Sequence, residues 1–306
     1  MKKRVKAMAL VCVMAIISCK ADASAIKKEK LETVRVIKIM SGTRKFSEDK
    51  DEINTLKWTI IKPDECPQNG SYICKYNKYG LVKEFYDPFK DKKYIYRYDD
   101  DKLVCADFIY YYSHNNKASK KKNRYEPKEE WEYDKKGRAV KCDGAWGIFK
   151  KYVYKGKKKQ IKGIKRADGM DKYSYREYNY NEKRQISLVR LQNKISSTYT
   201  EDSVRPYEYD EHGNIITTYG GADEKANYQY DSAGYPISCE YGHDEYQVDG
   251  PPYNEVWHLE KYNFEYMTMK VPKKYIKTIK QQQWDIVNHF FTEDMFFDVI
   301  TPYLNF

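Results

Sequence analysis

The sequence predicts an all-β protein built from a row of β-hairpins and ending in a short helix, on three observations. Tyrosine, which favours strands over helices, occurs 32 times against 11 Phe and 5 Trp in 306 residues. A short tyrosine motif recurs along the middle of the chain with the residues of a tight turn. After Pro272 the apolar residues take up helical spacing.

The motif is centred on an anchor tyrosine, usually preceded two positions earlier by another aromatic residue. Period-two alternation places both residues on one face of a strand, which we expect to be the buried face. Asp or Asn follows most anchors, and Gly stands four residues after several of them, as in a chain reversal. An apolar residue then begins the second strand. The seven anchors are Tyr76, Tyr98, Tyr133, Tyr154, Tyr180, Tyr209 and Tyr230.

Residues 207–214 (YEYDEHGN) are the copy most similar to the YD repeat of the Rhs family, which the pattern resembles over residues 72–240. The resemblance implies a wound antiparallel sheet of about seven YD-like β-hairpin repeats. Lys102, Lys158 and Arg184 stand where the repeat has Gly, so these turns must differ. Encapsulation of a toxin, known in large members, is not carried over. The sequence leaves open whether the sheet is an open curl or a closed barrel.

The first 25 residues have the pattern of an export signal, with basic residues before the apolar run Ala7–Ile17. That run is too short to span a bilayer, which needs about 20 residues. Residues 16–19 (IISC) resemble the lipobox of bacterial lipoproteins, which implies a lipid on Cys19 and a protein anchored in the envelope, by resemblance at the outer membrane. The alternatives are cleavage after a small-x-small pattern at 21–25, giving a soluble periplasmic or secreted protein, and an uncleaved anchor.

We expect four parts: a lipoprotein signal peptide (1–18), a flexible tether (19–32), a YD-like β-repeat domain (33–270) and a helical C-terminal cap (271–306). Residues 33–40 and 56–61 read as additional strands. The helical cap is expected to cover an exposed edge of the sheet, where unpaired strands would otherwise associate.

Charge and cysteine content limit the partners. The net charge is +11, but Lys outnumbers Arg, whose planar fork is preferred for phosphate and base recognition, so nucleic acid is disfavoured. Five cysteines lie beyond Cys19, an odd number that cannot pair fully within one chain. Cys66 and Cys74 flank a turn-forming stretch, and their spacing allows a hairpin disulfide.

No catalytic motif, cofactor motif or metal-ligand spacing is present. Cys239, His243 and His258 are too widely spaced for a typical zinc site. Consecutive residues of a strand point to opposite faces, so Tyr110, Tyr111 and Tyr112 cannot all be buried. We therefore take them as binding candidates, together with the basic residues Lys120, Lys121 and Lys122.

A second basic cluster spans residues 155–166. It has two interpretations: it contacts anionic sugars or lipid headgroups, or it is a solvated surface that keeps the protein soluble.

The favoured function is a lipid-anchored cell-envelope protein whose repeat body is a non-catalytic binding or scaffolding module for protein or glycan partners. One alternative is an exported glycan hydrolase using carboxylates among Asp99, Asp100, Asp101, Asp210 and Glu211. Adjacent acids in a strand point to opposite faces, which argues against such a pair. The other alternative is a soluble periplasmic immunity or inhibitor protein.

Overall fold

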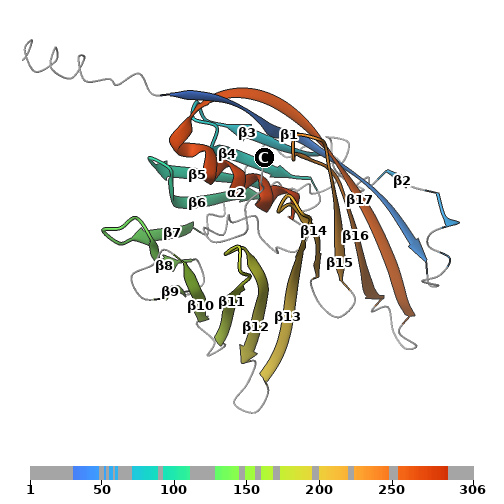
Figure 1. Ribbon diagram of the computed structural model, residues 1–306. Coiled ribbons are helices and arrows are strands. Elements are labelled where there is room, and N and C mark those ends of the chain that lie inside the picture. The colour runs from blue at the N-terminus through green and yellow to red at the C-terminus, as the bar shows by residue number, and fades with distance from the viewer. Residues whose placement is uncertain are drawn as a thin grey trace, which may run out of the picture.

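The computed structural model describes residues 30–47, 52, 55–57, 59–60, 71–88, 92–110, 128–144, 149–155, 160–167, 173–194, 200–219, 224–247 and 254–288. They form a single 17-stranded sheet and one helix (Figure 1). A 3-10 turn, η3 (Lys273–Tyr275), leads into helix α2 (Ile276–Val287). The strands are β1 (Leu31–Ser47), β2 (Thr59–Ile60), β3 (Ser71–Tyr76), β4 (Val82–Asp87), β5 (Lys92–Asp99), β6 (Lys102–Tyr110), β7 (Lys128–Tyr133), β8 (Ala139–Asp143), β9 (Phe149–Tyr154), β10 (Ile161–Ala167), β11 (Tyr173–Tyr180), β12 (Ile186–Lys194), β13 (Thr200–Tyr209), β14 (Ile215–Tyr219), β15 (Lys225–Tyr230), β16 (Pro236–Gln247) and β17 (Asn254–Pro272).

The strands close into a barrel. From β3 to β17 each strand pairs antiparallel with the next. Strand β1 completes the ring, because it pairs with β17 on one side and with β3 and the short β2 on the other. The expected wound sheet of about seven hairpin repeats with a helical cap is therefore wrong. Closure joins the two ends of the ring, since β1 lies between β17 and β3 and pairs with both.

Tight turns join the strands at one end of the barrel, which we call the turn end. Gly80, Gly137, Gly213 and Gly234 have φ between 69° and 83°, the left-handed region that glycine enters freely. Arg184 has a φ of 64° at the corresponding place in its turn. The β5–β6 turn is shorter, with Asp99 paired to Lys102, and its left-handed residue is Asp100.

The strand register shifts by one residue beside these turns, and tyrosine hydroxyls bind at the shifts. Tyr98 pairs with Leu103 and Arg97 with Cys105, so Val104 is an extra residue in a bulge. The Tyr133 hydroxyl then donates to the Leu103 carbonyl over 2.9 Å. Among the described residues eight tyrosines do this, and we call them the tyrosine belt: Tyr76 to Ile37, Tyr98 to Val82, Tyr133 to Leu103, Tyr154 to Ala139, Tyr180 to Ile161, Tyr209 to Ile186, Tyr230 to Ile215 and Tyr266 to Pro236.

Strands β1 and β17, the two ends of the sheet, pair in the same way as the two strands of a hairpin, although no turn connects them. Tyr266 of β17 pairs with Ile37 of β1, and the register shifts just beyond Ile37. The Ile37 carbonyl accepts a hydrogen bond from the Tyr76 hydroxyl, just as the carbonyls beside the turns accept hydrogen bonds from the other belt tyrosines. The belt therefore continues across the seam between β1 and β17.

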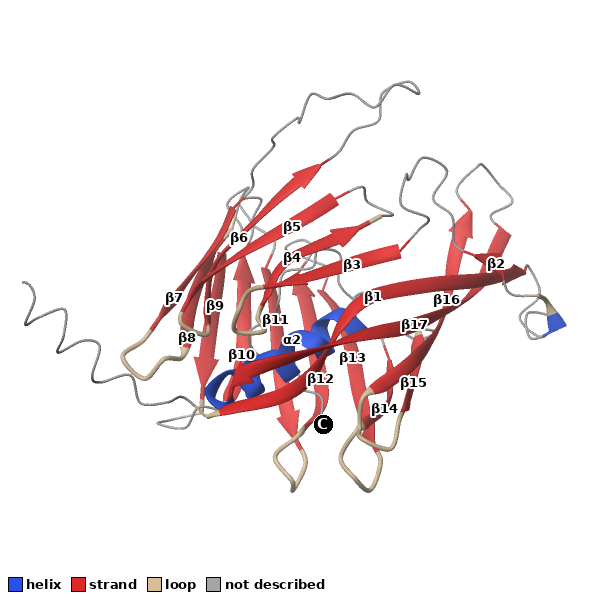
Figure 2. Cartoon of the chain, turned by 90° about the horizontal axis from the view of Figure 1, so that it is seen from above, coloured by secondary structure: helices blue, strands red, loops and turns tan. Residues whose placement is uncertain are grey.

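Helix α2 lies within the ring of strands (Figures 1 and 2). The Gln282 side chain accepts a hydrogen bond from the Val82 backbone N–H (3.0 Å) and donates to the Tyr98 hydroxyl (2.8 Å). Gln283 does the same with the Ile37 N–H (2.7 Å) and the Tyr76 hydroxyl (3.2 Å). The helix does not cover an outer sheet edge as expected. It packs inside the barrel against the belt.

The two faces of the barrel wall differ in composition. Aromatic and aliphatic side chains of the strands join Trp284 and Ile286 of α2 in a buried interior cluster. The outer face carries charged residues in cross-strand pairs, such as Lys75 with Glu84 (3.2 Å), Glu132 with Lys141 (3.4 Å) and Glu240 with Lys261 (2.9 Å). The wall thus has a mainly apolar inner face, with a few buried charges, and a polar outer face.

Candidate functional site

The residues predicted to bind partners or lipid lie almost wholly outside the described part of the chain. Cys19, Tyr111, Tyr112 and the lysines Lys120, Lys121 and Lys122 are not described. The backbone of Tyr110 ends β6, where it is paired with Lys92. These residues therefore stay predictions, and candidate sites must be built from the barrel wall itself.

A row of aromatic rings crosses the inner wall from β17 to β6. Tyr72 stacks on Phe85 with ring centroids 5.7 Å apart and meets Tyr262 edge-on at 6.3 Å. Tyr94 continues the row, 6.2 Å from both Phe85 and Phe108. All five rings are at most 5% exposed, so the row packs the core and presents little surface to a ligand.

One cation is held against this row. Lys92, only 2% exposed, places its ammonium 3.8 Å from the ring centre of Phe108 and 4.7 Å from that of Tyr94. Such contacts partly offset the cost of removing the charge from water. A second inward charge, Lys150, pairs with the buried Glu129 at 3.2 Å.

Two histidines that the sequence had suggested as weak metal candidates are direct cross-strand neighbours. His243 pairs with His258, and their rings stack 5.0 Å apart. Tyr241 stacks on His243 at 4.8 Å. Within the described ranges, no group of three His, Cys, Asp or Glu side chains has an arrangement suited to a metal ion. The cluster packs the wall between β16 and β17.

Three of the carboxylates that the hydrolase hypothesis would use form hydrogen bonds within a turn or between a turn and the helix. Asp100 accepts hydrogen bonds from the Tyr275 hydroxyl (2.6 Å) and the Lys274 ammonium (3.0 Å), and these bonds lower the pKa of its carboxyl group. Asp101 accepts one from Thr278 (3.2 Å). These contacts attach the β5–β6 turn to the start of α2. Asp210 caps its own turn, while Asp99 and Glu211 are exposed.

The described cysteines are buried thiols. Cys74, Cys105, Cys142 and Cys239 are free, so the disulfide between Cys66 and Cys74 is not formed in this structure. Burial raises the pKa of Cys74 to about 12, which leaves almost no thiolate at neutral pH. Burial raises the pKa of the Cys105, Cys142 and Cys239 thiols in the same direction.

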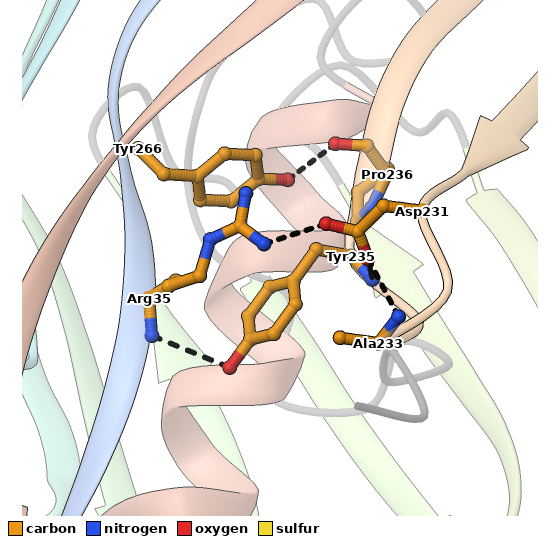
Figure 3. Close-up of polar contacts among 6 residues, drawn as sticks. All are labelled: Arg35, Asp231, Ala233, Tyr235, Pro236 and Tyr266. Atoms are coloured by element: carbon orange, nitrogen blue, oxygen red, sulfur yellow. Dashed lines mark hydrogen bonds and ion pairs between the residues drawn. The ribbon is translucent and has the colours of Figure 1, made fainter.

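Arg35 forms a clamp at the seam that sequence analysis did not detect (Figure 3). Its guanidinium lies 4.6 Å from the ring centres of both Tyr235 and Tyr266 and pairs with Asp231 at 2.5 Å. Its backbone N–H donates to the Tyr235 hydroxyl (3.3 Å). Asp231 also caps the β15–β16 turn through the N–H of Ala233 (3.0 Å). The clamp ties β1 to a turn two strands away around the ring.

Comparisons with known proteins give weak likenesses. No family model matches, and no curated protein matches. The chain is similar to a porin-like protein from Bacteroides uniformis at 11% identity, with a TM-score of 0.38, over 75% of this chain and 96% of that one. It is also similar to TcdB2-TccC3-Cdc42 at 12% identity, with a TM-score of 0.24, over 75% of this chain and 14% of that one. For the Tc holotoxin pore of Photorhabdus luminescens the identity is 12% and the TM-score 0.24, over 72% of this chain and 13% of that one.

In the part of the chain that the structure describes, no helix combines the length and apolar character needed to cross a membrane.

Proposed function

We propose that the protein is a cell-envelope protein held to the membrane by a lipid on Cys19, with the barrel as a non-catalytic binding or scaffolding body outside the bilayer. The observation that carries the proposal is the charged outer face of the wall. A barrel immersed in lipid needs an apolar outer band, whereas this outer face carries paired charges such as Arg97 with Asp107 at 2.5 Å.

The inner face supports a binding or scaffolding role over a channel. The interior cluster is apolar and buried, and α2 lies across the inside of the barrel. A diffusion channel would need a polar, water-filled interior. Partners would therefore meet the outer wall and the loops.

The position of β1 supports a particular orientation at the membrane. Its first residue, Leu31, pairs with Pro272 immediately before η3, near the turn end. A tether running from Cys19 to Leu31 would therefore place the turn end towards the membrane. The opposite end of the barrel would face away from it.

Cleavage of the tether tests the proposal. A site for a specific protease is inserted between Cys19 and Lys30, and an epitope is added after Phe306. Membranes carrying the protein are then treated with the protease. We expect labelled palmitate on the wild type, none on Cys19→Ala, and release of the epitope-bearing barrel into the soluble fraction after cleavage. A barrel that stays in carbonate-washed membranes after cleavage, or a wild type without lipid, would contradict the proposal.

Protease treatment of intact cells, with a periplasmic protein as lysis control, determines on which side of the membrane the barrel lies. Loss of the epitope would favour surface partners such as glycans, and protection would favour periplasmic partners.

A further inference from the structure

Three lysines face one another directly across adjacent strands on the outer wall. Lys141 of β8 pairs with Lys151 of β9, and Lys151 pairs with Lys165 of β10. We call these residues the lysine row. Neighbouring strands lie about 4.8 Å apart, and like charges directly opposite each other destabilise a sheet.

Carboxylates compensate this charge at one end only. Lys141 pairs with Glu132 (3.4 Å) and Asp143 (2.5 Å). Lys151 and Lys165 are exposed, and no carboxylate oxygen of the described residues comes within ion-pair distance of either. Other directly opposite pairs on the outer wall combine opposite charges, as in Lys75 with Glu84 and Glu240 with Lys261, while Glu130 opposite Asp143 is a pair of acids.

Aromatic side chains flank the row. At one end the Lys141 ammonium lies 5.6 Å from the ring centre of the half-buried Phe149. At the other end Tyr175 is paired with Lys165. The Tyr175 ring lies over Gly163, where a Cβ atom would come within 2.7 Å of it. The glycine therefore makes room for a flat ring beside the cations. Among the described residues, Glu177 is an acid on that side, and it pairs across the strands with Gly163 and Arg190.

We propose that the outer face of β8, β9 and β10 binds a linear anionic polysaccharide. Its acidic groups pair with Lys151 and Lys165, and a sugar ring stacks on Tyr175. Evenly spaced cations beside flat apolar faces fit a polymer that alternates charged groups with sugar rings. This inference deepens the proposed binding function and rests on it.

The test uses the purified full-length chain in mild detergent, with polygalacturonate as the probe and dextran as the neutral control. We expect the double variant Lys151→Gln/Lys165→Gln to bind polygalacturonate about thirtyfold more weakly, since each lysine near an anionic surface contributes about fivefold. The matched control is Lys83→Gln/Lys225→Gln, which removes the same charge from exposed sites outside the row and should keep wild-type affinity.

A second variant separates binding from folding. Lys151→Glu places an acid between Lys141 and Lys165, so we expect the melting temperature to rise while polygalacturonate binding is lost. Opposite changes in stability and affinity are not expected from a merely damaged fold.

Three results would overturn the inference: no binding of the wild type to polygalacturonate, equal loss in both double variants, or binding only to phosphatidylglycerol vesicles. Because the protein is purified, these results do not depend on membrane attachment. If the lipid-labelling and cleavage experiment on Cys19 failed, the polygalacturonate results would still be interpretable. That failure would contradict the lipid anchor of the proposed function and not the polysaccharide site.

Discussion

Each belt tyrosine donates to a carbonyl at the register shift of a neighbouring strand pair, as Tyr133 and Tyr180 do. The acceptor is the residue paired with the preceding anchor, as Ile161 is paired with Tyr154. The Tyr180 hydroxyl donates to that Ile161 carbonyl over 2.8 Å. A buried polar group that loses its partner costs about 1 to 3 kcal/mol. The hydroxyl therefore links one hairpin to the next, in addition to the packing of its ring against the core.

Removing one belt hydroxyl should destabilise the barrel. Tyr180→Phe keeps the ring but loses the bond to Ile161, so we expect the free energy of unfolding to fall by about 1 to 2 kcal/mol. Urea unfolding followed by tyrosine and tryptophan fluorescence measures this. Tyr219→Phe is the control, because the Tyr219 hydroxyl bonds the exposed Glu208 outside the belt (3.1 Å). Equal losses in both variants would show that the belt is not special.

The belt also predicts sensitivity to alkali. Burial raises the pKa of Tyr180 to about 12, against about 10 in an unfolded chain. Between these values the folded state keeps a proton that the unfolded state has lost, so stability falls as pH rises. The contribution of the protonated Tyr180 hydroxyl to the free energy of unfolding is complete below pH 10 and is lost as the pH rises through 12. Burial raises the pKa of Tyr76, Tyr98 and Tyr230 in the same direction.

Urea titrations at pH 8 and at pH 11 measure this sensitivity. We expect the wild-type midpoint to fall between the two, and to fall less in Tyr180→Phe relative to its own value at pH 8. An unchanged wild-type midpoint would contradict the assignment of a raised tyrosine pKa.

At the scale of the element, α2 is held by two adjacent amides. Gln282 and Gln283 each satisfy a strand N–H at a register shift and a belt hydroxyl. Both side chains are at most 3% exposed. The apolar spacing of Ile279, Trp284 and Val287 predicted the helix. It could not predict the glutamines' role, because their partners lie 184 to 246 residues away in sequence.

Replacing one glutamine with an apolar residue of similar size should loosen the helix from the belt. Gln282→Leu leaves the buried Val82 N–H without an acceptor, and we expect a loss of about 1 to 3 kcal/mol. Thermal unfolding compares it with Lys277→Leu, an exposed position on the same helix. A Gln282→Leu variant as stable as the control would mean that water replaces the amide, and the bridging role would be wrong.

At the scale of the whole molecule, the sequence predicts turns better than closure. Gly80, Gly137, Gly213 and Gly234 adopt the left-handed backbone that the motif requires, because a turn depends on adjacent residues. The wound sheet was wrong because closure depends on β1 pairing with β17 at the other end of the chain. The one local signal of this seam, Phe264-Glu265-Tyr266, has the aromatic spacing of the motif but lacks its acid and its glycine.

The seam is expected to open first, because no turn joins its two strands. The Arg35 clamp supplies an ion pair and two ring contacts there, together worth about 1 to 2 kcal/mol at a partly exposed site. Arg35→Met keeps much of the side-chain volume and removes the charge. We therefore expect amide hydrogen exchange to accelerate in β1 and β17 while β11 and β12, on another part of the ring, keep wild-type rates.

The matched control for the seam is Arg97→Met, which removes an ion pair with Asp107 (2.5 Å) near a hairpin that has its own turn. There the covalent connection keeps β5 and β6 adjacent when the ion pair is lost, so exchange should change little. Local opening of a closed barrel begins at the least stable strand pair. The difference in exchange rates between the two variants therefore measures how much the clamp contributes to closure. Uniform acceleration around the ring in Arg35→Met would show that the barrel opens as one unit and that the seam is no weaker than a hairpin.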